Sequence, residues 1–278
     1  MKQSARNFKD NIKCRRLQQF GSLDVMEASY HKQNFSRHAH DCYAFGIVTQ
    51  GRLDFSYQHR DWQASAGDIN LVVPGEVHDG HGGTGDGWSY KMLYMPVELV
   101  GEVTSSLSGK DFLPYFLPGV IARSPLAVGL QQLHQVLSDE AETLLRQESA
   151  VWNWLAAFIE KYSERRIILP TGRHEDSAVK SAIEYLQEHY EDNVTLKKLA
   201  SIAGLSPYYL LHVFSSAVGM PPHLYQQMLR VQKAKQLLAT GISPVMIASD
   251  MGFIDQSHFS RQFKKISGLT PVGYQKMF

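Results

Sequence analysis

Two stretches near the C-terminus repeat one another: Leu199-Ala-Ser-Ile-Ala-Gly-Leu205 and, 48 residues later, Ile247-Ala-Ser-Asp-Met-Gly-Phe253. In each stretch an alanine stands where a following helix can cross closely, and a glycine stands where a helix ends and the chain needs a positive φ. Ser206 and Asp255, which follow the two glycines, are residue types that cap the start of a helix. The repeat therefore predicts two helix-turn-helix units, each with a second helix suited to the major groove of DNA.

The segment between the two copies predicts one long helix. It begins at Pro221-Pro222, its apolar residues recur at helical spacing to about Thr240, and Gly241 follows. A helix of about 18 residues is roughly 27 Å long at 1.5 Å per residue. Successive major grooves on one side of a duplex lie roughly 34 Å apart, so this helix could hold both reading helices on the same side.

Upstream of these helices the periodicity is different. From about Arg37 to Met95, short apolar runs alternate with Gly, Asp and Pro turn signals. The runs are Tyr43–Val48, Leu53–Tyr57, Ile69–Val73 and Tyr90–Met95, and their regular spacing predicts an all-β sandwich or barrel. The pattern from Leu126 to Tyr162 is helical, and Glu164–Asp176 is charged and aperiodic. The predicted organisation is a domain over residues 1–163, a linker over 164–176 and a helical domain over 177–278.

Composition narrows the class of protein. Hydrophobic residues make up 44% of the 278 residues and charged residues 20%. No run reaches the roughly 18–20 apolar residues that cross a bilayer, no secretory leader is present, and Cys14 and Cys42 are too few for a disulfide framework. A cytoplasmic protein with no membrane partner is expected. Residues 177–278 carry ten Lys/Arg against six Asp/Glu, a balance that fits DNA binding or an ordinary solvated face.

The last hundred residues resemble the DNA-binding domain of the AraC/XylS transcription regulators, from Ala178 to Phe278. The resemblance is carried by Gly252–Pro271 and by Ser206–Leu210 with the Phe and Pro that follow. In that family the exposed side of each second helix faces the major groove. The resemblance implies these DNA-binding residues: Tyr208, Leu211, His212, Gln256, Ser257, Ser260, Arg261, Lys264 and Lys265.

One residue departs from the family's pattern. Where this chain has His212, the family commonly has an arginine. Arginine can form two hydrogen bonds to guanine, whereas neutral histidine forms one at most. The first unit is therefore expected to read its part of the site less stringently, and Arg261 is the residue expected to contact guanine.

The N-terminal part resembles the cupin-type effector domain that precedes this DNA-binding domain in many family members. The resemblance covers residues 36–97 and rests on His38-Ala-His40, Gly51, Ala66-Gly67-Asp68 and Pro74-Gly75-Glu-Val-His78. The helical segment Leu126–Tyr162 takes the place of the family's dimerisation segment. The implied fold is two-domain α+β: an N-terminal cupin-like β-barrel with dimerisation helices, and a C-terminal all-α domain with two helix-turn-helix units.

Three histidines in the N-terminal part admit two interpretations. His38 and His40 lie two apart on a predicted strand and so share one face, and a hairpin would bring His78 beside them. They could form a three-nitrogen metal site, or they could shape an effector pocket through hydrogen bonds. Metal-binding cupin enzymes usually supply a glutamate where this chain has Ala44, so no metal and no other cofactor is expected. The predicted effector-binding residues are His38, His40, His78, Trp88, Tyr90 and Met92.

The sequence as a whole predicts a transcription regulator rather than an enzyme. The expected partners are double-stranded DNA, a small-molecule effector, a second copy of the chain and, since family members are mostly activators, RNA polymerase. The alternative is a metal sensor, or a metal-dependent cupin enzyme with an accessory DNA-binding domain.

Overall fold

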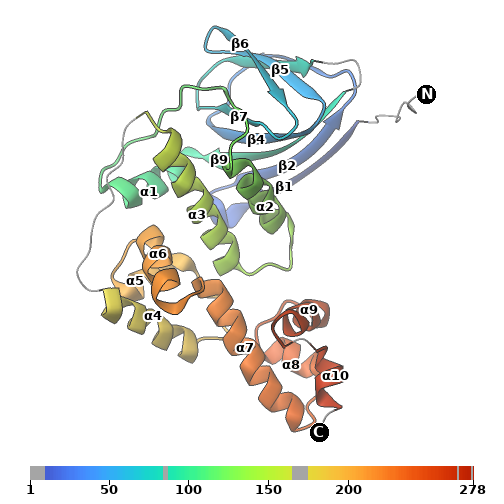
Figure 1. The fold of residues 1–278 in the computed structure, drawn as a ribbon, viewed down its shortest axis with the longest axis vertical. Helices are drawn as coiled ribbons and strands as arrows, with labels where there is room; N and C mark the ends of the chain where they lie inside the picture. The colour runs from blue at the N-terminus through green and yellow to red at the C-terminus, as the bar shows by residue number, and fades with distance from the viewer. Residues whose placement is uncertain (1–9, 84–86, 165–174, 268, 277) are drawn as a thin grey trace. The chain divides into compact units, whose positions relative to one another are not determined.

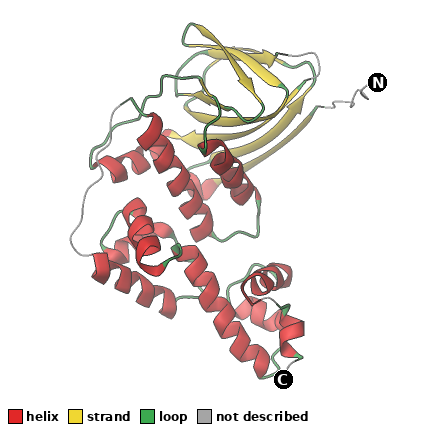
Figure 2. Ribbon diagram, in the orientation of Figure 1, coloured by secondary structure: helices red, strands yellow, loops and turns green. Residues whose placement is uncertain are grey.

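In the computed structural model of the chain, residues 10–83, 87–164, 175–267, 269–276 and 278 are described. The chain divides into two compact units, Met1–Ser138 with Trp154–Pro170 and Asp139–Asn153 with Thr171–Phe278. The strands all belong to the first unit, and the described part of 175–278 is helical (Figures 1 and 2). Of the predicted linker over 164–176, residues 165–174 lie outside the described residues.

The first unit is built on two antiparallel sheets. The six-stranded sheet has the order β1 (Asn11–Leu17), β2 (Leu23–Tyr30), β9 (Trp88–Pro96), β4 (Cys42–Gln50), β7 (Ile69–Val72) and β10 (Val120–Ile121). The four-stranded sheet has the order β3 (Asn34–His38), β8 (His78–Gly82), β5 (Arg52–Tyr57) and β6 (Arg60–Ser65). The predicted β architecture is confirmed, and the four predicted runs correspond to β4, β5, β7 and β9, except that Val73 lies just after the end of β7.

The core of this unit contains side chains from both sheets. Burial alternates along β5, where Leu53, Phe55 and Tyr57 are buried and the residues between them are half-buried. These three side chains belong to the same buried cluster as Val48 and Trp88 of the six-stranded sheet. Alternation of this kind places every second side chain on the inner face of a strand, so the sequence pattern sets which residues line the interior.

Helices cover part of the six-stranded sheet. The described helices of this region are α1 (Val97–Ser108), α2 (Leu126–Ser138) and α3 (Leu144–Tyr162), after the short 3-10 helix η1 (Gln18–Phe20). α2 packs against β2, β4 and β9, and its Leu130, Leu133 and Leu137 are each no more than 2% exposed. The apolar face predicted to dimerise is therefore occupied within the chain itself. Val128, on the same helix, is 59% exposed.

The second unit contains both helix-turn-helix units. The first consists of α5 (Leu196–Ala203) and α6 (Pro207–Val218), and the second of α8 (Pro244–Asp250) and α9 (Gln256–Ser267). α4 (Glu175–Glu188) precedes them, α7 (Pro222–Ala239) runs between them as predicted, and α10 (Pro271–Gln275) follows (Figure 1).

The turn and cap residues take the conformations that the repeat predicts. Gly204 and Gly252 have φ values of +65° and +69°. The hydroxyl of Ser206 accepts a hydrogen bond from Tyr209 N at 3.3 Å, and the Asp255 carboxylate accepts one from His258 N at 2.6 Å. Both predicted helix-turn-helix units are confirmed. No helix among the described residues has the length and apolar character to cross a membrane.

Candidate functional site

A pocket of about 530 Å³, including its open mouth, lies in the interior of the first unit. Its lining comes from both sheets and from the residues that follow β3. The lining residues are Phe35, His38, His40, Ala44, Leu53, Phe55, Asn70, Val72, His78, Asp79, Gly80, Tyr90, Met92 and Tyr94. The lining combines apolar walls with a few polar groups, as small-molecule sites do.

The three predicted histidines meet in this pocket. His38 and His78 are cross-strand partners in the pairing of β3 with β8, and their ring centroids are 4.3 Å apart. The His40 ring lies 4.8 Å from His38 and 5.0 Å from His78. The prediction that His40 shares a strand with His38 is wrong, because β3 ends at His38 and His40 lies in the connection to β4. That connection nevertheless brings the His40 ring back to the same cluster.

Hydrogen bonds to the backbone orient two of these rings. His38 Nδ1 lies 2.7 Å from the carbonyl oxygen of Ser36, and His78 Nδ1 lies 3.1 Å from that of Glu76. A carbonyl oxygen can only accept, so Nδ1 donates in both cases and Nε2 keeps its lone pair in the neutral ring. Both Nε2 atoms can therefore accept a hydrogen bond or bind a metal.

Two rings of the cluster, His40 and His78, are neutral at physiological pH. Burial, followed by the neighbouring His78 and His38 rings, lowers the pKa of His40 to about 4. Burial also lowers the pKa of His78, partly opposed by the hydrogen bond to Glu76. Close imidazoles in a partly dry site resist protonation because each added charge is poorly solvated and repels the next.

Asn70 is a polar lining residue that the sequence analysis missed. It lies within β7 in the apolar run Ile69–Val72 and is 5% exposed. Its Nδ2 donates to the Met92 sulfur at 3.5 Å, whereas its Oδ1 has no hydrogen-bond partner among the described residues. A buried acceptor without a partner is costly, so Asn70 Oδ1 is an atom that a ligand donor or an ordered water would satisfy.

Of three aromatic residues on β9, two line the pocket and one does not. Tyr90, as predicted, and Tyr94 line it from β9, and burial is the main cause that raises the pKa of each phenol, so both remain neutral donors. Trp88 does not line the pocket. Its side chain is fully buried and packs against Tyr30 at 5.3 Å between ring centroids. Tyr90, Met92 and Tyr94, at every second position of β9, line the pocket, and Trp88 lies beyond the end of the lining.

In the second helix-turn-helix unit, α9 presents the predicted face to solvent. Phe259 and Phe263 are fully buried, and the predicted DNA-binding residues lie on the remaining surface of the helix. Gln256, Ser257, Arg261, Lys264 and Lys265 are exposed, and Ser260 is half-buried. The three basic side chains and three polar ones give this face the charge and the hydrogen-bonding groups that DNA contacts require.

In the first helix-turn-helix unit, the prediction that Leu211 contacts DNA is wrong. Leu211 is 2% exposed and belongs to the core side of α6 together with Leu210 and Phe214. α6 packs against three helices, α4, α5 and α7. More of its surface is therefore buried than the positions of Leu210 and Phe214 alone. His212 is exposed and Tyr208 is half-buried. Ser216, four residues after His212, is also exposed on this side and was missed, since its signal is only the helical spacing.

Two parts of the chain match known protein families. Residues 20–152 match the family described as "AraC-like ligand binding domain", and residues 199–277 match the one described as "Helix-turn-helix domain". Together with the geometry above, these matches define the class: a DNA-binding transcriptional regulator with an N-terminal ligand-binding domain.

Similar proteins carry the match across both units. The HTH-type transcriptional regulator YbfI of Bacillus subtilis (strain 168), itself uncharacterised, is 33% identical over 226 residues, covering 81% of this chain and 82% of the relative. The arabinose operon regulatory protein of Escherichia coli (strain K12) is 35% identical over 249 residues, covering 84% and 80%. The lactose operon transcription activator of Staphylococcus xylosus is 24% identical over 247 residues, covering 84% and 83%. The chain belongs to the AraC family of transcriptional regulators.

Proposed function

We propose that this regulator is a cytoplasmic transcription activator, without catalytic activity, whose effector is a neutral, hydroxylated small molecule held in the barrel pocket. The observation that carries the proposal is the donor and acceptor set of the lining. It offers three imidazoles, of which His40 and His78 are neutral at physiological pH, together with the Asn70 amide and two neutral phenols, and Asp79 is its one acidic residue among those described.

The state of Asp79 limits the charge that the pocket offers to a ligand. Its Oδ1 accepts a hydrogen bond from Ser56 N at 2.8 Å, and its Oδ2 lies 3.9 Å from Arg37 Nε. No Lys or Arg is among the described lining residues, so an anionic effector would be desolvated without a countercharge. A molecule with several hydroxyl groups would instead both donate and accept at the imidazole, amide and phenol groups.

A monosaccharide matches these requirements. Hydroxyl groups can reach the polar side chains, and the apolar C–H face of a sugar ring can pack on Phe35, Phe55 or Tyr90. Two similar proteins are described as the arabinose operon regulatory protein and the lactose operon transcription activator, which supports a carbohydrate effector and an activating role here.

DNA binding is proposed to use α6 and α9 in successive major grooves. The contributing residues are Tyr208, His212 and Ser216 on α6, and Gln256, Ser257, Ser260, Arg261, Lys264 and Lys265 on α9. Their exposure along one helical face of each element supports this assignment. Activation is proposed to involve contact with RNA polymerase, and the working form is proposed to be a homodimer in which exposed positions of α2 such as Val128, rather than its buried leucines, are available for the contact.

The effector proposal is tested by thermal unfolding of the full chain with neutral sugars and with the matching sugar acids. L-arabinose and lactose are the first neutral probes, and galacturonate is the charged comparison. A ligand at a hundred times its Kd stabilises the folded state by about 2.7 kcal/mol, which raises the Tm by several degrees. Asn70→Leu should abolish the shift, and Ser216→Ala, on α6, should leave it unchanged. A larger shift with the acid than with any neutral sugar would refute the proposal.

A second candidate is a metal-responsive regulator, favoured by the geometry of the histidines. One ring nitrogen of each of His38, His40 and His78 lies within 4.8 Å of those of the other two. Neutral imidazoles whose Nδ1 atoms donate to backbone carbonyls are suited to transition metals such as Zn²⁺. Ala44, at the position where an acidic ligand would stand, lines the pocket and is buried. The three histidines would thus hold the ion, and its remaining positions would face the pocket.

Metal analysis separates the two candidates. With a sugar effector, purified protein should hold less than one transition-metal ion per chain, and chelators should leave DNA binding intact. One tightly held ion per chain that is lost in His78→Ala would instead favour the metal-responsive regulator.

A further inference from the structure

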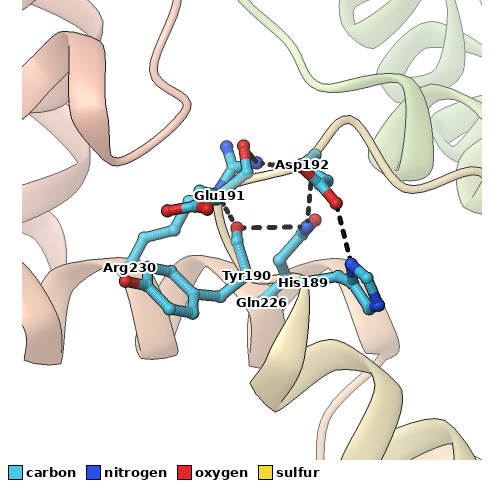
Figure 3. A network of polar contacts seen from close by, with 6 residues as sticks. All are labelled: His189, Tyr190, Glu191, Asp192, Gln226 and Arg230. Atoms are coloured by element: carbon cyan, nitrogen blue, oxygen red, sulfur yellow. Dashed lines mark hydrogen bonds and ion pairs between the residues drawn. The ribbon is translucent and has the colours of Figure 1, made fainter.

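A buried arginine in α7 contacts both the connection that leads into the first helix-turn-helix unit and the turn of the second. Arg230 is 2% exposed, and its guanidinium donates to four backbone carbonyl oxygens. Figure 3 draws three of the acceptor residues, Tyr190, Glu191 and Asp192. Nε reaches Tyr190 O at 2.6 Å and Nη1 reaches Gly252 O at 2.6 Å. Nη2 reaches Asp192 O at 2.9 Å and Glu191 O at 3.3 Å.

These acceptors come from two different parts of the helical unit. Tyr190, Glu191 and Asp192 lie in the connection between α4 and α5, which leads into the first helix-turn-helix unit. Gly252 lies in the turn between α8 and α9, inside the second. One side chain on the long intervening helix therefore joins the segment that leads into the first helix-turn-helix unit to the turn of the second. Only the planar fork of arginine, with its five N–H donors, can serve so many acceptors in one arrangement.

The two backbone segments also touch each other at this point. A Cβ atom added to Gly252 would lie 2.0 Å from Glu191 O and 2.9 Å from Arg230 Nη2. The equivalent glycine of the first unit, Gly204, has nothing within 4 Å of such an atom. The close contact with the connection between α4 and α5 is therefore made by the turn at Gly252 and is not a general feature of the helix-turn-helix turn.

Neighbouring hydrogen bonds also hold the connection between α4 and α5, but they do not reach the second helix-turn-helix unit. Gln226, one helical turn before Arg230, donates to Asp192 O at 2.9 Å and Tyr190 O at 3.3 Å (Figure 3). His189 is fixed by the Asp192 carboxylate at 2.9 Å. Gln226 and Arg230 therefore share two acceptors, and only Arg230 reaches Gly252.

Burial at this position is costly for a cation, which makes a purely stabilising role inefficient. Burial lowers the pKa of Arg230 to about 10, opposed by the charge of Asp192, and the guanidinium remains protonated at neutral pH. A buried cation that is solvated by carbonyl dipoles pays a desolvation cost that an apolar side chain of similar size would avoid. An apolar side chain has no hydrogen-bond donors, so it could not hold the four carbonyl oxygens in position.

We propose that Arg230 is a positioning residue that sets the orientation of the second helix-turn-helix unit relative to the first, and thereby the base-pair spacing that α6 and α9 can read together. The inference rests on the proposed reading of two successive grooves. α7 is roughly 27 Å long, so a rotation of about 10° between its ends displaces a reading helix by several ångströms. Base contacts tolerate far less than this, because hydrogen bonds weaken steeply outside about 2.7–3.2 Å.

The first experiment measures the dependence of binding on spacing. Duplexes of about 20 base pairs, enough for two successive grooves, are selected on the full-length wild-type chain. The best duplex is then compared with a version that carries one extra base pair between the two contacted segments. Wild type should lose at least about tenfold in affinity, the loss typical of one mismatched contact or more. Arg230→Lys, which keeps the charge but offers one donor group, should bind the two duplexes within about threefold of each other.

Gln226→Leu is the matched control. It removes hydrogen bonds from the same two carbonyls and should lower the Tm, but it leaves the link between Arg230 and Gly252 in place. It should therefore retain the wild-type preference for spacing. If Gln226→Leu loses that preference as fully as Arg230→Lys does, general destabilisation explains the result and the proposal is wrong.

A second measurement needs no DNA. Spin labels at Ser216→Cys on α6 and Ile266→Cys on α9, in a chain with Cys14→Ser and Cys42→Ser, report the distance distribution between the two reading helices. The distribution should be narrow with Arg230 and at least about twice as wide with Arg230→Lys. Because this measurement uses the same folded chain, circular dichroism on each sample establishes that the helices are intact. Should Arg230→Lys not fold, Arg230→Gln takes its place.

The outcomes test the reading of two successive grooves and the role of Arg230 separately. A wild-type chain that tolerates the extra base pair would refute the two-groove reading itself. A wild-type chain that discriminates, beside an Arg230→Lys chain with equal discrimination and an equally narrow distance distribution, would refute only the role of Arg230.

Discussion

Substituting alanine for each of the two turn glycines separates the cost of backbone conformation from that of close packing. Gly204 and Gly252 occupy equivalent places in the repeat and have nearly equal φ values of +65° and +69°. A left-handed conformation costs an L-residue about 1 kcal/mol or somewhat more. The loss of glycine's freedom in the unfolded chain returns about 0.4–1 kcal/mol. Gly204→Ala should therefore lower the free energy of unfolding by no more than about 1 kcal/mol.

Gly252→Ala carries an additional cost. Its Cβ would lie 2.0 Å from Glu191 O, closer by more than 1 Å than an ordinary contact, and the neighbouring atom belongs to the backbone and so cannot rotate away. Overpacking of this kind typically costs about 1–3 kcal/mol, and the total expected loss is about 2–4 kcal/mol. Urea unfolding of the full chain, followed by circular dichroism at the helical band, measures both variants. Equal losses would refute the reasoning, because the turn conformation alone would then account for both glycines.

The remaining predictions concern DNA reading, the core of α6 and pH. Arg261→Ala should cost about 1–3 kcal/mol on the specific duplex and relax base preference at one or two positions, whereas Lys264→Ala should weaken specific and random duplexes alike in a binding titration; equal effects on both duplexes in the two variants would make Arg261 a phosphate contact. Leu211→Ala should lower the free energy of unfolding by about 2–5 kcal/mol and leave the affinity of the folded protein for DNA unchanged, which a titration at low temperature checks. Because the pKa of His40 is lowered to about 4 in the folded state, the unfolded state gains the proton first as pH falls below its own value near 6.5. Stability is then fully present above about pH 6.5 and is lost toward pH 4, and a urea midpoint that rises between pH 7 and pH 5 would contradict this.

The helical unit was predictable in detail because its signals are local. Three signals each act within a few residues: a glycine at the end of the first helix, a capping residue after it, and core residues at helical spacing. The repeat provides two independent copies of them. The prediction failed at Leu211, where the number of neighbouring helices rather than the local pattern decides how much of α6 is buried. That number is a property of the tertiary structure.

The strands were less visible where their side chains face solvent or a polar site. β8 has the sequence HDGHG and β6 the sequence RDWQAS, and neither alternates in the way that predicts a strand. The tight connection between β5 and β6 is made by Gln58 and His59 at positive φ values of 52° and 58°. These residues are not the Asn-Gly or Gly-Gly types that announce such a turn, so pairing with neighbouring strands must hold them there.

The pocket shows the same limit. The histidines were predictable because two of them are two residues apart and the third follows a Pro-Gly turn. Asn70 was not, because it stands in an apolar run, and such a run predicts only a buried strand. Its importance follows from a carbonyl oxygen without a partner among the described residues, which is a fact of three-dimensional packing.

The two reading helices, α6 and α9, differ in charge, and this bears on how the pair would read DNA. α6 contains no Lys or Arg, whereas α9 contains Arg261, Lys264 and Lys265. Of the two reading helices, only α9 therefore offers Lys and Arg side chains that attract phosphates, the interaction that supplies most of non-specific affinity. The basic side chains of the first helix-turn-helix unit, Lys197 and Lys198, lie on α5 instead, so α6, with His212 and two tyrosines at its start, contributes chiefly through fit to the groove. A neutral helix cannot find its groove by charge, so its contribution depends on being held at the correct distance from the charged one.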